Sequence, residues 1–199
     1  MKTLKTAITL ILLAATVLSF NSCTKKKLSA DEISDLKYLR EEEKLARDIY
    51  LHSYDRYGEE VFKNISESEQ KHMDKLLKLL DDYKIEDPAS NTVGVFNNAE
   101  LQNLYNVLAH QADSSLKEAL IVAATIEDVD IFDIDQFIGR TSQKDIIDAY
   151  EKLNCGSDNH MRAFTDKLAA YNYTYTPQYI SLEEYVSILS ASSGGCGKK

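Results

Sequence analysis

The feature that most constrains this chain is a helical repeat of apolar residues that is broken four times by acidic or imidazole side chains. In the first stretch, Leu36, Leu39, Glu43, Ala46 and Tyr50 follow one another at spacings of 3 and 4, so they share one face of a helix. Three later stretches repeat this pattern. The residues that interrupt the four apolar stripes are Glu43, then Glu69 and His72, then Glu127 and Asp130, and last His160. The repeat predicts four amphipathic helices that turn polar side chains towards a shared interior.

The composition supports an all-α fold in one domain. The chain has 199 residues, which is enough to bury a substantial core, and only 7 Gly and 2 Pro. Its formal charge of -9 argues against a nucleic-acid partner and against binding to anionic lipid by charge. The sequence contains neither a basic patch with interleaved aromatic residues nor a glycine-rich phosphate loop.

The expected helices follow from capping residues and helix-breaking residues. Ser29 and Glu32 have the spacing of a capping box. The predicted helices span about 31–57, 61 or 64 to 84, 98–110, 115–139 and 142–171, and a short helix follows Ser181. The fifth is capped in this interpretation by Thr141 or Ser142, and Gly156 inside it indicates either a local bulge or close backbone packing.

The connections also shape the predicted fold. The crossover between the second and third long helices carries the short helix 98–110, which suits two long helices that run parallel. Residues 173–179 are expected to form an extended strap that packs Tyr rings over the helices, ahead of the last short helix. The predicted domain spans 35–190, and a disordered tail is expected from 191 to 199.

The N-terminus has the pattern of a targeting segment. Lys2 and Lys5 precede a largely apolar run from Ala7 to Phe20, which at 14 residues is too short to span a bilayer. Ser22-Cys23 then resembles the cleavage box of bacterial lipoproteins. We therefore expect a signal peptide over 1–22, lipidation of Cys23 and a linker over 23–34, with membrane contact only through the lipid anchor in the bacterial cell envelope. The alternative is a plain secretory signal and a soluble secreted or periplasmic protein.

The remaining cysteines do not require a disulfide. With Cys23 lipidated, only Cys155 in a predicted helix and Cys196 in the predicted tail are left. A bond between them is conceivable. We interpret them instead as a small core thiol and an incidental tail thiol.

The polar side chains in the apolar stripes have the chemistry of a metal site. An isolated buried carboxylate is destabilising by several kcal/mol, and divalent metals such as iron and manganese bind carboxylate oxygen and imidazole nitrogen. Glu69-x-x-His72 places two ligands one turn apart, as in di-metal helical bundles. Ser157, three residues before His160, stands where such a pattern has its second Glu. Either Asp130 replaces this Glu, or the site is one ligand short, binds a single metal or is open to solvent or substrate. The predicted ligands are Glu43, Glu69, His72, Glu127, Asp130 and His160. The alternative is a buried hydrogen-bond network without metal.

Five segments carry a family resemblance. They are residues 43–50, 68–73, 126–131, 156–160 and 175–179. Together they resemble the ferritin-like family called domain of unknown function 2202, over nearly all of residues 35–190. Glu43-x-x-Ala46-Arg47 and Glu69-x-x-His72 are also distantly similar to rubrerythrin-type di-iron proteins. The resemblance implies a ferritin-like four-helix bundle with a carboxylate-bridged metal pair, and it implies no substrate.

Two classes of function follow. In the first, a di-metal envelope lipoprotein uses iron or manganese to react with oxygen or peroxide, as an oxidase or peroxidase. In the second, a non-catalytic binding or scaffold lipoprotein has a structural metal or none, and its acidic surface or Tyr-rich strap contacts a partner. The sequence leaves the oligomeric state open, with a dimer as one alternative.

Overall fold

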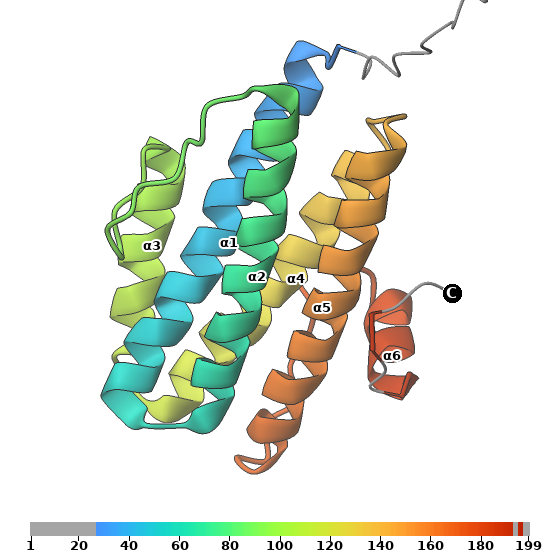
Figure 1. The fold of residues 1–199 in the computed structure, drawn as a ribbon. Helices are drawn as coiled ribbons and strands as arrows, with labels where there is room; N and C mark the ends of the chain where they lie inside the picture. The colour runs from blue at the N-terminus through green and yellow to red at the C-terminus, as the bar shows by residue number, and fades with distance from the viewer. Residues whose placement is uncertain (1–26, 193–194, 197–199) are drawn as a thin grey trace, which may run out of the picture.

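The computed structural model describes residues 27–192 and 195–196, and this part of the chain contains six helices and no strand (Figure 1). In chain order the helices are α1 (Ala30–Tyr57), α2 (Glu60–Tyr83), α3 (Ala99–Ala112), α4 (Leu116–Ile138), α5 (Lys144–Ala169) and α6 (Leu182–Ser190). The prediction of an all-α fold is confirmed. Within the described residues, no helix is both long and apolar enough to cross a membrane. The predicted leader and Cys23 lie outside the described residues.

Most helix ends follow the capping residues seen in the sequence. At the start of α1, the Ser29 hydroxyl accepts from the Glu32 amide at 3.1 Å, and the Glu32 carboxylate accepts from the Ser29 amide at 2.7 Å. This is the expected capping box. Gly58 ends α1 with φ of 69°, a left-handed conformation that favours glycine. Ser181 caps α6 as expected.

The predicted cap of the fifth helix is wrong. The residue that caps α5 is Gln143, and its side chain makes no capping hydrogen bond. Thr141 uses its hydroxyl elsewhere, donating to the Glu32 carboxylate at 2.7 Å and accepting from the Gln143 amide at 3.1 Å. The hydroxyl thus ties the α4–α5 turn to the first turn of α1, a contact between segments far apart in the sequence.

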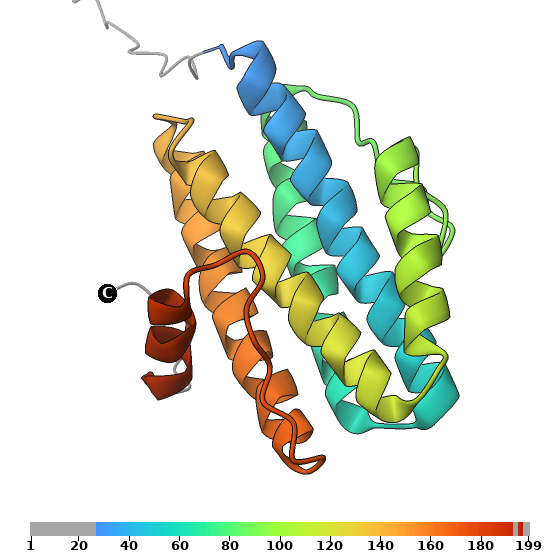
Figure 2. The same ribbon diagram turned by 180° about the vertical axis from the view of Figure 1, so that it is seen from behind.

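The four long helices contact one another in a cycle. α1 packs on α2, α2 on α5, α5 on α4, and α4 on α1 (Figures 1 and 2). α1 and α2 run antiparallel, as do α4 and α5, whereas α2 and α4 run in the same direction (Figure 1). The crossover makes this possible because α3 carries the chain back along the outside of α1 and α4. In this structure the two long helices that the crossover connects therefore run parallel.

The interior of the four helices is built in three layers. One apolar cluster, which includes Ile49, Phe62 and Phe164, fills the end where α1 joins α2. A second cluster, which includes Leu39, Leu76 and Leu153, fills the other end. Fully burying side chains of this size contributes about 1.5–3 kcal/mol each. Between the clusters lies a layer of buried polar residues at the level where the apolar stripes are interrupted.

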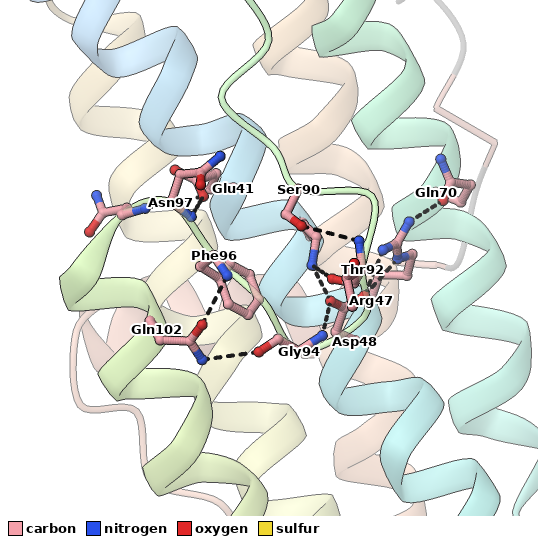
Figure 3. A network of polar contacts seen from close by, with 12 residues as sticks. Glu41, Arg47, Asp48, Gln70, Ser90, Thr92, Gly94, Phe96, Asn97 and Gln102 are labelled. Atoms are coloured by element: carbon pink, nitrogen blue, oxygen red, sulfur yellow. Dashed lines mark hydrogen bonds and ion pairs between the residues drawn. The ribbon is translucent and has the colours of Figure 1, made fainter.

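The crossover is fastened to α1 by a buried ion pair (Figure 3). The side chains of Lys44 and Asp48 are fully buried and lie 2.5 Å apart. The Lys44 ammonium also donates to the carbonyl oxygen of Thr92 at 2.9 Å and lies over the Phe96 ring, while the Gly94 amide donates to Asp48 at 2.9 Å. A buried pair persists only when its remaining hydrogen-bonding capacity is met. Here the crossover backbone meets part of it, and Arg47 donates to the other Asp48 oxygen at 2.9 and 2.7 Å.

The strap is held by a second buried carboxylate. Asp128 on α4 accepts hydrogen bonds from the Tyr175 hydroxyl at 2.8 Å and from the backbone amides of Gln178 and Ile180 at 2.5 and 2.9 Å.

A disulfide joins Cys155 of α5 to Cys196 beyond α6. The interpretation of these cysteines as unrelated thiols is therefore wrong. The strap and α6 bring Cys196 beside α5, a proximity set by tertiary packing.

Candidate metal centre

Four helices deliver the predicted ligands to the polar layer. Glu43 comes from α1, Glu69 and His72 from α2, Glu127 and Asp130 from α4, and His160 from α5. All six are buried, and the exposed fraction is 1% for the three glutamates. The structure brings five of them into two overlapping groups whose ligand atoms lie within 4.8 Å of one another. We call Glu43, Glu69 and His72 the first half-site, and Glu69, Glu127 and His160 the second half-site.

Glu69 is shared because its two oxygen atoms face different histidines. Its Oε2 lies 2.8 Å from Nδ1 of His72, and its Oε1 lies 2.7 Å from Nδ1 of His160. A second carboxylate completes each half-site. Glu43 Oε2 lies 3.1 Å from Nδ1 of His72, and Glu127 Oε2 lies 3.4 Å from Nδ1 of His160. Glu69 thus contacts both half-sites through separate oxygen atoms.

Several buried ligand atoms have no hydrogen-bond partner. Oε1 of Glu69 and Nδ1 of His160 lie 2.7 Å apart, yet within the described part of the chain neither makes a hydrogen bond of acceptable geometry. Oε1 of Glu43 is likewise without a partner there. Buried polar atoms are nearly always satisfied in native proteins, so these need an explanation. Oxygen and nitrogen atoms that converge without hydrogen bonding fit a metal ion between them.

Burial and neighbouring charges shift the pKa values of the carboxyl and imidazole groups of the metal-free cluster. Burial opposes the ionisation of Glu69, but His160 and His72 hold the pKa of its carboxyl well below the usual range. Burial raises the pKa of Glu43 to about 8 even though His72 opposes the shift, and burial also raises the pKa of Glu127. Burial alone would lower the pKa of His160, but Glu69 and Glu127 raise it to about 10. The cluster therefore holds protons that bound cations would replace.

Asp130 stands apart from both half-sites. Its Oδ2 accepts a hydrogen bond from the Ser157 hydroxyl at 2.5 Å. Its Oδ1 is buried and has no partner within the described residues. The aspartate thus lies beside the residue that replaces the expected second Glu of α5. Among the described residues it belongs to neither group of three ligands.

Each histidine is positioned by a small residue of the neighbouring helix. A Cβ atom on Gly156 would lie 2.5 Å from Nε2 of His72, so the α5 backbone forms one wall of the pocket for this ring. On the other side of the centre, Nε2 of His160 lies 2.9 Å from the Ser68 hydroxyl of α2. Of the two predictions for Gly156, close packing is confirmed. Such outer contacts fix the orientation of histidine ligands.

Tyr50 contacts the candidate metal centre, although its position on the apolar stripe indicates mainly a packing role in the core. Its ring packs on Phe164 with ring centroids 5.1 Å apart, and its hydroxyl donates to Oε1 of Glu127 at 2.5 Å. The hydrogen bond leaves Oε2 of Glu127 facing His160. Tyr50 follows Glu43 by two helical turns on the same stripe, and this spacing is the feature of the sequence that indicates a contact with the site.

Comparison with known proteins shows the family. The model of the family described as "Uncharacterized protein domain (DUF2202)" matches residues 32–192. This chain belongs to the DUF2202 family. A relative in this comparison, the uncharacterized protein MJ0754 of Methanocaldococcus jannaschii, is 49% identical over 174 residues, which are 87% of this chain and 94% of that protein.

A solved structure supports the helical arrangement of this DUF2202 chain. The crystal structure of the hypothetical protein MJ0754 from Methanococcus jannaschii DSM 2661 matches it with a TM-score of 0.84 and 49% sequence identity. The match covers 87% of this chain and 99% of the solved chain.

Changing Tyr50 to Phe is expected to destabilise the metal-free DUF2202 protein by about 1–3 kcal/mol, because Oε1 of Glu127 would stay buried without its donor. Urea denaturation followed by circular dichroism measures the change. Tyr150→Phe is the matched control, since Tyr150 is equally buried and makes no hydrogen bond through its hydroxyl within the described residues. Equal losses in the two variants would contradict a specific role for the Tyr50 hydroxyl.

Proposed function

We propose that this protein is a ferritin-like protein that binds two divalent metal ions, iron or manganese, through Glu43, Glu69, His72, Glu127 and His160. The observation that carries the proposal is the placement of the two Glu69 oxygens against different histidines, with Oε1 left without a hydrogen bond. The cycle of four long helices and the parallel course of α2 and α4 support the ferritin-like assignment.

The proposed chemistry is an oxidase or peroxidase reaction. A bound iron or manganese pair would supply electron transfer to oxygen or peroxide. Glu43, Glu69 and Glu127 would hold the ions through carboxylate oxygen, and His72 and His160 through imidazole nitrogen. Ser68 orients His160, and Tyr50 orients Glu127 through the hydrogen bond to its Oε1. The apolar clusters on either side of the polar layer limit access of bulk water.

We further propose that the protein works in the bacterial cell envelope, anchored through a lipid on Cys23. The motif around Cys23 in the sequence supports this location. Incorporation of a radiolabelled fatty acid, lost in a Cys23→Ala variant, tests it.

A second candidate is a binding or scaffold lipoprotein in which the metal is structural or absent. An exposed apolar stripe favours it, because Leu182 and Val186 on α6 are 66% and 55% exposed and Tyr179 in the strap is 50% exposed. A partner that binds this stripe would require no redox chemistry. The two candidates differ in what metal removal does to activity and stability.

Metal analysis of the full-length protein, purified without a polyhistidine tag, tests the first candidate. We expect about two first-row metal ions per chain, and a spectral change that saturates at this ratio when iron(II) is added in air. The absence of first-row metal and of any spectral change would contradict metal binding. Metal whose chelation lowers the melting temperature, with no turnover of oxygen or peroxide, would favour the scaffold.

A further inference from the structure

A second set of acidic side chains leads from the surface to the candidate metal centre. On α4, Glu127, Asp130 and Asp133 are spaced three residues apart, so each step advances about 4.5 Å along the helix. On α1, Glu42 directly precedes Glu43. Asp133 is half-buried, whereas Glu42 and Asp130 are buried. The carboxyl groups thus form a series from the half-exposed Asp133 to the buried cluster.

The series contains buried oxygen atoms whose hydrogen-bonding capacity is not met. The Glu42 carboxyl lies close enough to Asp133 and to Asp130 to interact with both. Oε2 of Glu42 and Oδ1 of Asp130 are buried and have no hydrogen-bond partner within the described residues. Two unpartnered oxygens on facing helices are suited to a transient cation.

The opposite side of the centre is closed by side-chain contacts. There α2 packs on α5, His72 lies against Gly156, and Nε2 of His160 lies 2.9 Å from the Ser68 hydroxyl. Lys75 and Lys152 lie near each other on this side, whereas the unpartnered oxygens of Glu42 and Asp130 lie on the α1–α4 side. The α1–α4 side is therefore the one that offers free carboxylate oxygens to a cation.

We propose that hydrated divalent cations reach the metal centre between α1 and α4, passing over Asp133, Glu42 and Asp130 before they bind the half-sites. This inference rests on the proposed function. On the way, a cation would exchange part of its bound water for carboxylate oxygens of these residues and take up water again on leaving, so no covalent bond is broken and no oxidation state changes. The path supplies the centre but contributes no permanent ligand to it, so it governs the rate of loading and not the final metal content.

Stopped-flow mixing of the metal-free, full-length protein with cobalt(II) tests the path through the absorbance of bound cobalt. We expect Glu42→Gln and Asp133→Asn to slow loading by about 10-fold, since charged surfaces accelerate association by 10-fold or more. The final cobalt content should equal that of the wild type. Asp158→Asn is the matched control, because it removes a half-buried acid that faces Arg162 and Asp135 instead of the path. Its loading rate should match that of the wild type.

The outcomes separate the path from the metal centre itself. Wild-type loading rates in both path variants would overturn the path while leaving the proposed metal centre intact. A lower final cobalt content with Glu42→Gln would also overturn it, because Glu42 would then be a ligand. If Glu42→Gln fails to fold, the half-exposed Asp133→Asn variant still decides the question. A wild-type protein that binds no cobalt would disprove both proposals.

Discussion

Changing Glu69 to Gln is expected to abolish metal uptake at both half-sites, whereas Glu43→Gln and Glu127→Gln should each empty one. The difference follows from geometry, since Glu69 faces His72 through one oxygen and His160 through the other. Loss of an outer partner of a ligand typically weakens metal binding 10- to 100-fold, so loss of a shared ligand should exceed about 100-fold. Metal analysis after dialysis against a buffered metal supply measures the stoichiometry.

The same substitution should also destabilise the metal-free protein, by about 3 kcal/mol, because it removes the partner of two charged imidazoles. Glu43→Gln should change stability less, since burial already keeps the Glu43 carboxyl largely protonated by raising its pKa to about 8. Glu67→Gln, which is exposed on the same helix, serves as the control and should change neither property. Two bound ions in the Glu69→Gln protein would refute the bridging role.

Changing Gly156 to Ala is expected to empty the first half-site and to destabilise the protein. Ala is favoured over Gly inside a helix by about 1 kcal/mol, so helix propensity alone predicts a more stable protein. The added Cβ would instead lie 2.5 Å from Nε2 of His72, a ring already held by Glu43 and Glu69. Overpacking of this kind typically is destabilising by about 1–3 kcal/mol. We expect the steric effect to exceed the propensity gain.

A double-mutant cycle with His72→Ala separates the two contributions. If the ring is the obstacle, Gly156→Ala should destabilise the wild-type background and stabilise the His72→Ala background, as measured by thermal unfolding. Metal content should fall from two ions to one in Gly156→Ala, with the second half-site retained. A Gly156→Ala protein that is more stable than the wild type and keeps both ions would show that His72 adjusts freely.

Much of the fold was predictable from local sequence signals. The apolar repeat gave the four long helices, and Ser29 and Ser181 cap helices as expected. The interruptions of the repeat predicted the buried polar layer in the same way. A Glu on an apolar stripe must lie inside the protein, and four such stripes must bring their polar residues together when the helices pack.

Other features depended on contacts between distant segments. The hydroxyl of Thr141 reaches Glu32 instead of capping α5, and the buried Lys44–Asp48 pair accepts and donates hydrogen bonds with the crossover backbone. Cys155 and Cys196 are neighbours because the strap, held by Asp128 of α4, leads to α6, which packs against α5. In each case the position of the side chain in the sequence is compatible with several hydrogen-bond or bonding partners. The packing of distant segments decides which partner it contacts.

By itself, the sequence determined that this chain forms amphipathic helices with acidic and imidazole groups on their buried faces, because helical periodicity is a local property of the chain. Only the tertiary structure decided which of these groups lie together and which lie apart. It placed Glu69 between two half-sites and Asp130 against Ser157, outside both. The physical reason is that interatomic distances across the interior depend on the rotation and axial position of each helix. These are set by the packing of all the helices together and not by the spacing of residues within one.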